Sequence, residues 1–129
     1  MMTENELTYQ IRGAIFEVYN NLGPGLLEKV YEEVLAYELH KRNLKVERQK
    51  KIPLCYDGKK LQGNLRLDIL VEDRVIIELK SVEKVTYLYH LQLLTYLKLT
   101  SLHRGILVNF NTDNILKSIW TKVNGCLPQ

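Results

Sequence analysis

The chain opens with two stretches in which apolar residues recur at helical spacing. From about Leu7 to Leu22, the residues Ile11, Ile15, Val18 and Leu22 fall three or four positions apart, which predicts an amphipathic helix with one apolar stripe. Gly23-Pro24-Gly25 breaks this pattern, and Pro24 suits the first turn of a following helix over about 26–41, which ends near Asn43. The first forty residues therefore predict two helices joined by a short linker.

The middle of the chain changes to strand-like patterns. Residues 46–56 read as extended, and Asp57-Gly58-Lys59 reads as a turn. Two strong strand candidates follow at Leu65–Val71 and Val75–Lys80, with Glu72-Asp73-Arg74 between them. These two strands are expected to form a tight hairpin.

A third helix and two further strands complete the pattern. A helix-like run covers about 86–99, and the short apolar stretch Arg104–Phe110 follows it. A crossover of that length favours parallel pairing of the strands it connects. Residues 115–123, which carry the only tryptophan, Trp120, resemble a last strand. The order α, α, β, β, β, α, β, β predicts an α/β fold.

The predicted hairpin separates its side chains into two sets. One set is wholly apolar and belongs in the core: Leu65, Leu67, Ile69, Val71, Val75, Ile77 and Leu79. The opposite set carries all the charge: Arg66, Asp68, Leu70, Ile76, Glu78 and Lys80. A three-residue turn places Asp68 directly across from Glu78, and Arg66 across from Lys80.

Opposed carboxylates on one face repel each other. A divalent cation between Asp68 and Glu78 would remove this repulsion, and Mg²⁺ prefers carboxylate and carbonyl oxygens together with water. The alternative is an exposed face on which Asp68 pairs with Arg66 or Lys80. The apolar Leu70 and Ile76 on the same face indicate partial cover, which makes unpaired charges more costly.

Composition and charge narrow the class of protein. The 129 residues are 46% hydrophobic and 26% charged, which predicts a single globular domain over residues 1–129. The polar, acidic start lacks the features of a secretory signal, and no stretch is apolar enough for a bilayer crossing, so a cytoplasmic location without a membrane is expected. The two cysteines, Cys55 and Cys126, have no metal-ligand spacing and are expected to be reduced thiols.

The net charge of +3 is mild but unevenly distributed. One basic segment carries eight cations against only Glu47 and Asp57: Lys41, Arg42, Lys45, Arg48, Lys50, Lys51, Lys59 and Lys60. This segment could hold a polyanion. Lysines that keep an exposed strand edge soluble explain it equally well.

Several motifs together resemble the PD-(D/E)XK nuclease superfamily. Asp68 corresponds to its first acid, Glu78-Leu79-Lys80 to its E-x-K element, and Gln92 to Tyr96 to the Q-x-x-x-Y element of one subgroup. Gly25 to Tyr31 matches the signature of the GxxExxY family in that superfamily. The resemblance covers about residues 8–120, with Leu67 in place of the proline that names the motif. It implies an αβββαβ core, in which helices flank a mixed central β-sheet.

The resemblance also implies roles for the site residues. Asp68 and Glu78 would hold Mg²⁺ or Mn²⁺ with the backbone carbonyl of Leu79, and Glu28 would be a further ligand to the metal or its water. Lys80 would orient water or neutralise phosphate charge, and Gln92 would act beside it. Tyr31 and Tyr96 are expected to contact the substrate, with core packing as the alternative. Arg66 is expected to bind phosphate, with an ion pair to Asp68 or Glu28 as the alternative.

The function implied is metal-dependent hydrolysis of phosphodiester bonds in nucleic acid. Low sequence specificity is expected because no base-reading module is visible, with DNA favoured over RNA as the substrate. A domain of this size is expected to act as a homodimer or with a partner protein. The alternatives are a catalytically weak nucleic-acid-binding module that retains the fold, and a protein-interaction module.

Overall fold

The computed structural model describes residues 1–125, so Cys126 lies outside the described part of the chain. A five-stranded sheet with the strand order β1-β2-β3-β4-β5 forms the centre. β3 and β4 are parallel and the other neighbours are antiparallel. The elements in chain order are α1 (Glu4–Leu22), α2 (Glu28–Lys41), β1 (Val46–Tyr56), β2 (Lys59–Val71), β3 (Val75–Lys80), α3 (Tyr87–Thr100), β4 (Arg104–Asn109), the 3₁₀ helix η1 (Ile115–Ser118) and β5 (Ile119–Val123).

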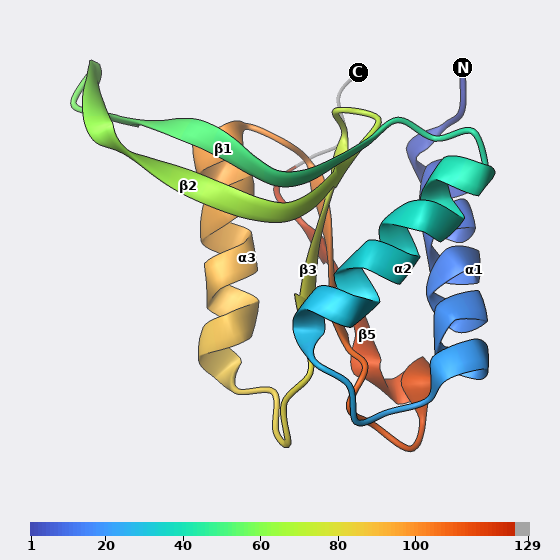
Figure 1. Cartoon of the computed structure of the whole chain (residues 1–129). Coiled ribbons are helices and arrows are strands. Elements are labelled where there is room, and N and C mark those ends of the chain that lie inside the picture. Colours follow the sequence, from blue (N-terminus) through green and yellow to red (C-terminus); the bar gives the residue numbers. More distant parts are fainter. Residues whose placement is uncertain (126–129) are drawn as a thin grey trace.

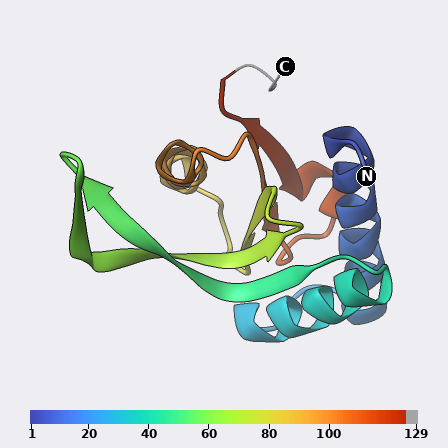
Figure 2. The same cartoon turned by 90° about the horizontal axis from the view of Figure 1, so that it is seen from above.

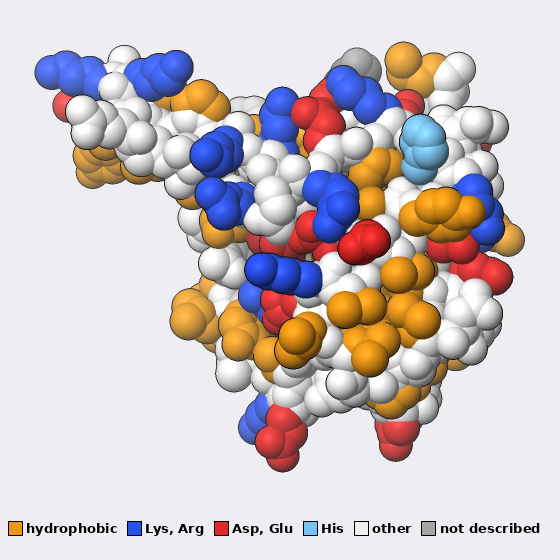
Figure 3. Space-filling view, viewed as in Figure 1, with side chains coloured by type: hydrophobic (Ala, Val, Ile, Leu, Met, Phe, Trp, Pro, Cys, Tyr) orange, Lys and Arg blue, Asp and Glu red, His pale blue; other side chains and the backbone are white. Residues whose placement is uncertain are grey.

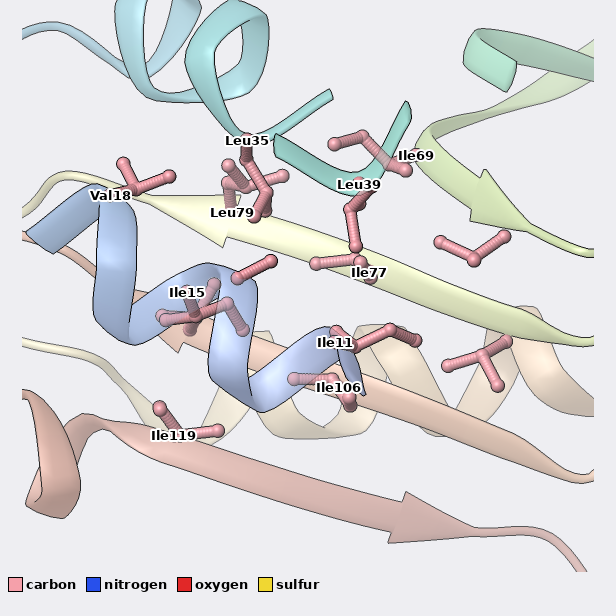
Figure 4. Close-up of a cluster of buried hydrophobic side chains, with 14 of the residues drawn as sticks. Ile11, Ile15, Val18, Leu35, Leu39, Ile69, Ile77, Leu79, Ile106 and Ile119 are labelled. Atoms are coloured by element: carbon pink, nitrogen blue, oxygen red, sulfur yellow. The ribbon is translucent and has the colours of Figure 1, made fainter. Parts of the chain in front are cut away.

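Helices cover both faces of the sheet, with α1 and α2 on one side and α3 on the other (Figures 1 and 2). The larger core lies beneath α1 and α2, where the apolar stripe of α1 meets the sheet (Figure 4). The predicted stripe residues Ile11, Ile15 and Val18 are fully buried there. This confirms the expected mixed α/β architecture and its order of elements.

A smaller core lies between the sheet and α3. Leu93 and Leu97 of α3 pack there with Leu107 of β4. Gly105 allows the close approach, because a Cβ at that position would lie 2.8 Å from Cδ1 of Leu93. Through this contact β4 fixes the height of α3 above the sheet, and with it the position of the polar side chains that α3 carries.

The turn between β2 and β3 has the predicted length and sets the predicted register. Val71 pairs with Val75, Leu70 with Ile76, and Ile69 with Ile77. Glu72 and Asp73 adopt positive φ angles of 54°, and the N–H of Arg74 donates to the carbonyl of Val71. The hairpin prediction is therefore confirmed over these three pairs.

Other boundaries differ from the prediction. Pro24 lies in the loop before α2, because the helix begins at Glu28 with Leu27 as its N-cap. β2 begins at Lys59, earlier than expected, and Ile115–Ser118 is a turn of 3₁₀ helix that precedes β5. Cys55 is exposed and is a free thiol, as expected.

The prediction that Leu65 and Leu67 belong with Ile69 in one core is wrong. Leu67 is buried with the α3 cluster, Ile69 is buried with the α1 and α2 cluster, and Leu65 is half-buried. Strict alternation would put all three on one face. The strand changes face between Leu67 and Ile69, at Asp68.

The outer halves of β1 and β2 extend past α3 as a twisted hairpin (Figures 1 and 2). Its tip is a two-residue turn in which Asp57 and Gly58 both have positive φ, as type I′ hairpin turns require. No helix in residues 1–125 combines the length and apolar character needed to cross a membrane.

Candidate active site

The site begins where the main-chain ladder between β2 and β3 stops. Beyond the pair Ile69 and Ile77, side chains replace main-chain bonds: Oδ2 of Asp68 accepts from the N–H of Leu79 at 2.9 Å. Oε2 of Glu78 in turn accepts from the N–H of Asp68 at 2.9 Å. The two carboxylates thus bridge the strands reciprocally, which fixes their orientation. The sequence prediction that these two acids meet across the hairpin agrees with this geometry.

Asp68 also lacks a regular partner on the other side. In β1, Arg48 pairs with Ile69 and Lys50 with Leu67, so Gln49 stands opposite Asp68, but the two form no ladder pair and Gln49 has a φ of +49°. Asp68 is therefore unpaired toward both neighbouring strands. Irregularities of this kind re-aim a side chain and are common beside active sites. The same distortion explains why β2 changes face at this residue.

Burial makes ionisation of the two acids costly. Burial and then the charge of Asp68 raise the pKa of Glu78 to about 8, although the N–H of Asp68 and the nearby Lys80 oppose the shift. Burial also raises the pKa of Asp68, and Glu32 and Glu28 add to that increase. The site therefore has an excess of negative charge in a place that is poor in water, and a cation would stabilise both ionised forms.

Lys80 lies beside the acids without forming an ion pair with either of them among the described residues. Its Nζ sits over the ring of Tyr89, 4.3 Å from the centroid. A cation in this position is held by the ring's negative face. The positive charge of Lys80 lowers the pKa of both Asp68 and Glu78. Its ammonium group is therefore close enough to act on the acid pair while it forms no ion pair within the described residues.

Glu28 lies at the first residue of α2, on the rim of the site. Its carboxylate accepts from the N–H of Ser81 at 3.3 Å, and its side chain is exposed. Ser81 also donates its hydroxyl to the carbonyl of Leu26. These bonds hold the start of α2 against the end of β3, so Glu28 lies near Asp68 without being one of the residues that bridge the strands.

Glu32, one turn further along α2, is a site neighbour that the sequence prediction missed. It is buried and accepts from Nε of Arg48 at 3.0 Å and from the side-chain amide of Gln49. It thereby ties α2 to the irregular part of β1 beside Asp68. The spacing of Glu28 and Glu32, four residues apart on one helix face, was the available signal.

Gln92 and Tyr96 are brought together on α3, as expected. Nε2 of Gln92 donates to the hydroxyl of Tyr96 at 3.3 Å. Burial raises the pKa of Tyr96, and Glu78 and Asp68 raise it further, which places the phenol within the field of the acid pair. Tyr89 lies three residues before Gln92, on the same face of α3. This spacing could have identified Tyr89 as a site residue, although the sequence prediction did not include it.

Tyr31 does not lie in the site. Its side chain is fully buried, it stacks on Phe110 with a centroid distance of 4.4 Å, and its hydroxyl donates to the carbonyl of Gly23 at 2.6 Å. The N–H of Leu26 donates to the same hydroxyl. The packing alternative therefore describes Tyr31, and the expected contact with substrate is wrong because no surface of the side chain is accessible.

Arg66 lies outside the bridged pair, in the part of β2 that pairs with β1. Its partner is Lys51, so the predicted position across from Lys80 is wrong: the β2–β3 ladder ends before reaching it. Arg66 is exposed, and among the described residues it forms no ion pair with Asp68 or Glu28. The ion-pair alternative for this residue is therefore not realised, and a contact with phosphate stays a prediction.

The donor set fits a divalent cation that keeps much of its water. Asp68 and Glu78 each use one oxygen for a main-chain N–H, and within residues 1–125 no third residue donates a hydrogen bond to either carboxylate. No group of three or more His, Cys, Asp or Glu side chains in that range forms a ready-made cage. Mg²⁺ is commonly bound by one or two carboxylates plus water and substrate oxygens, so two carboxylates are sufficient.

Comparison with known proteins agrees with this geometry. A family model described as the PD-(D/E)XK nuclease superfamily matches residues 5–123. No curated protein and no solved structure matches the chain significantly. The family match spans almost the whole chain and includes every residue of the bridged pair and its surroundings. The chain belongs to the PD-(D/E)XK nuclease superfamily.

Proposed function

We propose that the protein is a metal-dependent nuclease that hydrolyses phosphodiester bonds of nucleic acid with low sequence specificity. The observation that carries the proposal is the bridged pair of Asp68 and Glu78. These acids are held together by main-chain hydrogen bonds, each has one oxygen to which no third residue of the described chain donates, and a half-buried lysine lies beside them. A purely structural role would not require a half-buried and a buried acid to lie side by side.

Asp68 and Glu78 would hold the cation, with the carbonyl of Leu79 as a third ligand and Glu28 near enough to bind its water. A bound Mg²⁺ or Mn²⁺ supplies Lewis-acid polarisation of the phosphodiester and a more acidic water. The main-chain N–H groups of Asp68 and Leu79 fix the carboxylates in advance, so little reorganisation is needed when the cation binds.

The remaining polar groups act on the substrate side. Lys80 would neutralise charge that develops on the phosphate, and Tyr89 holds its ammonium group in place for this purpose. Gln92 and Tyr96 project from α3 toward the acid pair and would donate to a phosphate oxygen or to water. Each role depends on α3 being held at its present height by the contact of Leu93 with Gly105.

Within the superfamily we place the chain in the GxxExxY group. Gly25, Glu28 and Tyr31 supply the three residues of that signature. The contacts of these residues explain the signature. The hydroxyl of Tyr31 donates to the carbonyl of Gly23 in the loop before α2, and the carboxylate of Glu28 accepts from the N–H of Ser81 after β3. The signature would therefore position α2 beside the metal site.

The test is a cleavage assay with labelled single-stranded and double-stranded DNA and RNA. The purified protein is incubated with Mg²⁺, Mn²⁺ or EDTA, next to the variants Glu78→Gln and Lys80→Ala. Cleavage should require the metal and should be lost in both variants. Matched controls are Glu17→Gln and Lys117→Ala, which remove the same kinds of side chain from exposed positions on α1 and η1.

Cleavage that persists in EDTA, or that is equal in the variants and their controls, would contradict the proposal. Absence of cleavage from every substrate would also contradict it. If the wild-type protein binds DNA without cutting it, the alternative of a nucleic-acid-binding module is the better description.

A further inference from the structure

The basic segment of the sequence divides into two parts in the structure. On the body of the protein, acids neutralise four of its five cations, and the fifth, Arg42, donates to Oε1 of Gln10. Lys41 pairs with Glu38, and Lys45 with Asp73 at 2.8 Å. The side chains of Arg48 and Lys50 pair likewise, with Glu32 and Glu47 respectively. These body cations support the fold and leave little charge for a ligand.

The outer hairpin is different. We call residues 51–66 the arm. It carries Lys51, Lys59, Lys60 and Arg66 against the single acid Asp57. All four cations are exposed, and within the described residues none of them forms an ion pair. Figure 3 shows Lys and Arg side chains gathered at the tip of the arm and along its length.

The arrangement of the arm cations is unfavourable without a ligand. Lys51 and Arg66 are direct partners in the β1–β2 register, and like charges in that relation repel each other. The neighbouring Ile52 packs on the α3 side, so Lys51 and Arg66 project from the opposite face. Lys60 lines the same shallow depression as Lys51. An anion bound along this face would relieve the repulsion.

The arm is also continuous with the proposed active site. Arg66 precedes Asp68 by two residues in β2, about 7 Å along the strand, and Lys60 lies about 26 Å from Asp68 along it. DNA advances 3.4 Å per base pair, so the distance from Lys60 to Asp68 corresponds to about seven to eight steps. Residues 59–64 are all exposed and contribute nothing to either core, so packing does not explain why the arm is so long.

We propose that the arm binds the phosphate backbone of a DNA duplex and aligns it with the bridged pair of Asp68 and Glu78. The inference rests on the proposed nuclease function for the identity of the polyanion. A duplex fits better than a single strand, because single-strand binders stack bases on several aromatic rings. The arm has one aromatic residue, the exposed Tyr56 at its tip.

The test measures affinity for a labelled 30-base-pair duplex as a function of salt, in EDTA so that cleavage does not interfere. The arm variant is Lys51→Gln, Lys59→Gln, Lys60→Gln and Arg66→Gln combined. The control variant removes the same charge from exposed lysines elsewhere: Lys41→Gln, Lys45→Gln, Lys98→Gln and Lys117→Gln. Thermal unfolding verifies that both variants are folded.

The arm variant should bind at least tenfold more weakly at low salt. Its dependence of log affinity on log salt should be shallower by about 2 to 4, since each lost phosphate contact contributes about 0.9. The control should lose much less. Equal losses in the two variants, an unchanged salt slope, or no binding by the wild-type protein would overturn the proposal, as would tighter binding of a single strand that depends on Tyr56.

The two proposals can fail separately. If the arm variant binds duplex more weakly than its control but the wild-type protein cleaves no substrate, the nuclease function is contradicted and the arm remains a duplex-binding surface. If the protein cleaves nucleic acid with metal but the arm variant binds as well as its control, the nuclease function stands and the arm proposal is contradicted.

Discussion

The strand β2 carries two like-charge pairs, and they differ in what surrounds them. Toward β3, the half-buried Asp68 meets the buried Glu78, and main-chain N–H groups orient both acids. Toward β1, Arg66 meets Lys51 on an exposed arm where no hydrogen bond holds either side chain among the described residues. The buried pair has the fixed geometry that chemistry requires. The exposed pair has the solvated charge that suits binding to a polyanion.

This difference assigns separate tasks to the two ends of one strand. An oriented, desolvated pair of acids can bind a cation and act in the transition state. Exposed cations raise affinity and attract the substrate, and their contribution is screened by salt. We therefore expect changes at the acid pair to affect the rate of cleavage, and changes on the arm to affect binding.

The largest expected effect comes from Asp68→Asn. This change removes a metal ligand, and because changes to residues that only support metal ligands cost about 10- to 100-fold, we expect cleavage to fall by at least about 100-fold. Duplex affinity should stay the same or rise slightly, since a negative charge is lost near the phosphates. Gel-based cleavage rates and fluorescence anisotropy on the same substrate measure both. An equal loss of duplex affinity and cleavage rate would contradict the assignment of catalysis to the acid pair and of binding to the arm.

The second effect is a dependence of stability on pH in the absence of metal. Glu78 has a pKa of about 8 in the folded protein against an ordinary value of 4.5, so the folded state binds its proton more tightly than the unfolded state does. Stability is therefore highest below the ordinary pKa and is lost as the pH rises through about 8. Thermal unfolding in EDTA should show this decline.

Two controls sharpen this prediction. Glu78→Gln should flatten the decline, because the amide does not ionise, and saturating Mn²⁺ should restore stability at pH 8 in the wild-type protein only. A decline of the same size in Glu78→Gln would show that other groups cause it. The arm variant should retain the wild-type profile, since it leaves Glu78 and its surroundings unchanged.

A smaller effect is expected from Gly105→Ala. The added methyl group would lie 2.8 Å from Leu93, and such overpacking costs about 1–3 kcal/mol. Because α3 carries Tyr89, Gln92 and Tyr96, its displacement should also slow cleavage. Urea denaturation measures the loss of stability. The salt dependence of duplex affinity should not change. A change would show that α3, as well as the arm, contributes to duplex binding.

The smallest effect is a gain in stability from Lys51→Gln. Removing one of two opposed cations relieves a repulsion of about 0.2–1 kcal/mol. Urea denaturation at low salt should show the gain, and it should disappear at high salt because the charges are then screened. Lys117→Gln, at an exposed position on η1, is the matched control. A loss of stability in Lys51→Gln would mean that this lysine supports the arm rather than a ligand.

The sequence predicts a large part of this arrangement. The order of elements follows from apolar periodicity, and the short turn at Glu72-Asp73-Arg74 determines which residues of β2 and β3 pair. The acid pair follows from that register. Asp68, Glu78 and Lys80 also predicted the superfamily, and the family model that matches residues 5–123 shows that the chain belongs to it.

Other features could not be predicted, because they depend on contacts between distant segments. Alternation places Leu67 beside Ile69, and the distortion at Asp68 that separates them has no local signature. Helical spacing grouped Glu28 with Tyr31, whereas the packing of Phe110 draws Tyr31 into the core. The division of the basic segment into neutralised and free cations likewise depends on acids such as Glu32 and Asp73 from other elements.

The most direct test of the account is a single-turnover cleavage measurement on a DNA duplex at saturating protein concentration. We compare the wild-type protein, Glu78→Gln and the combined arm variant, each with Mg²⁺. We predict that the arm variant approaches the wild-type rate once it is saturated, while Glu78→Gln stays slow at every concentration. Cleavage by Glu78→Gln at the wild-type rate, or an arm variant that stays as slow as Glu78→Gln at saturation, would contradict this division between catalysis and binding.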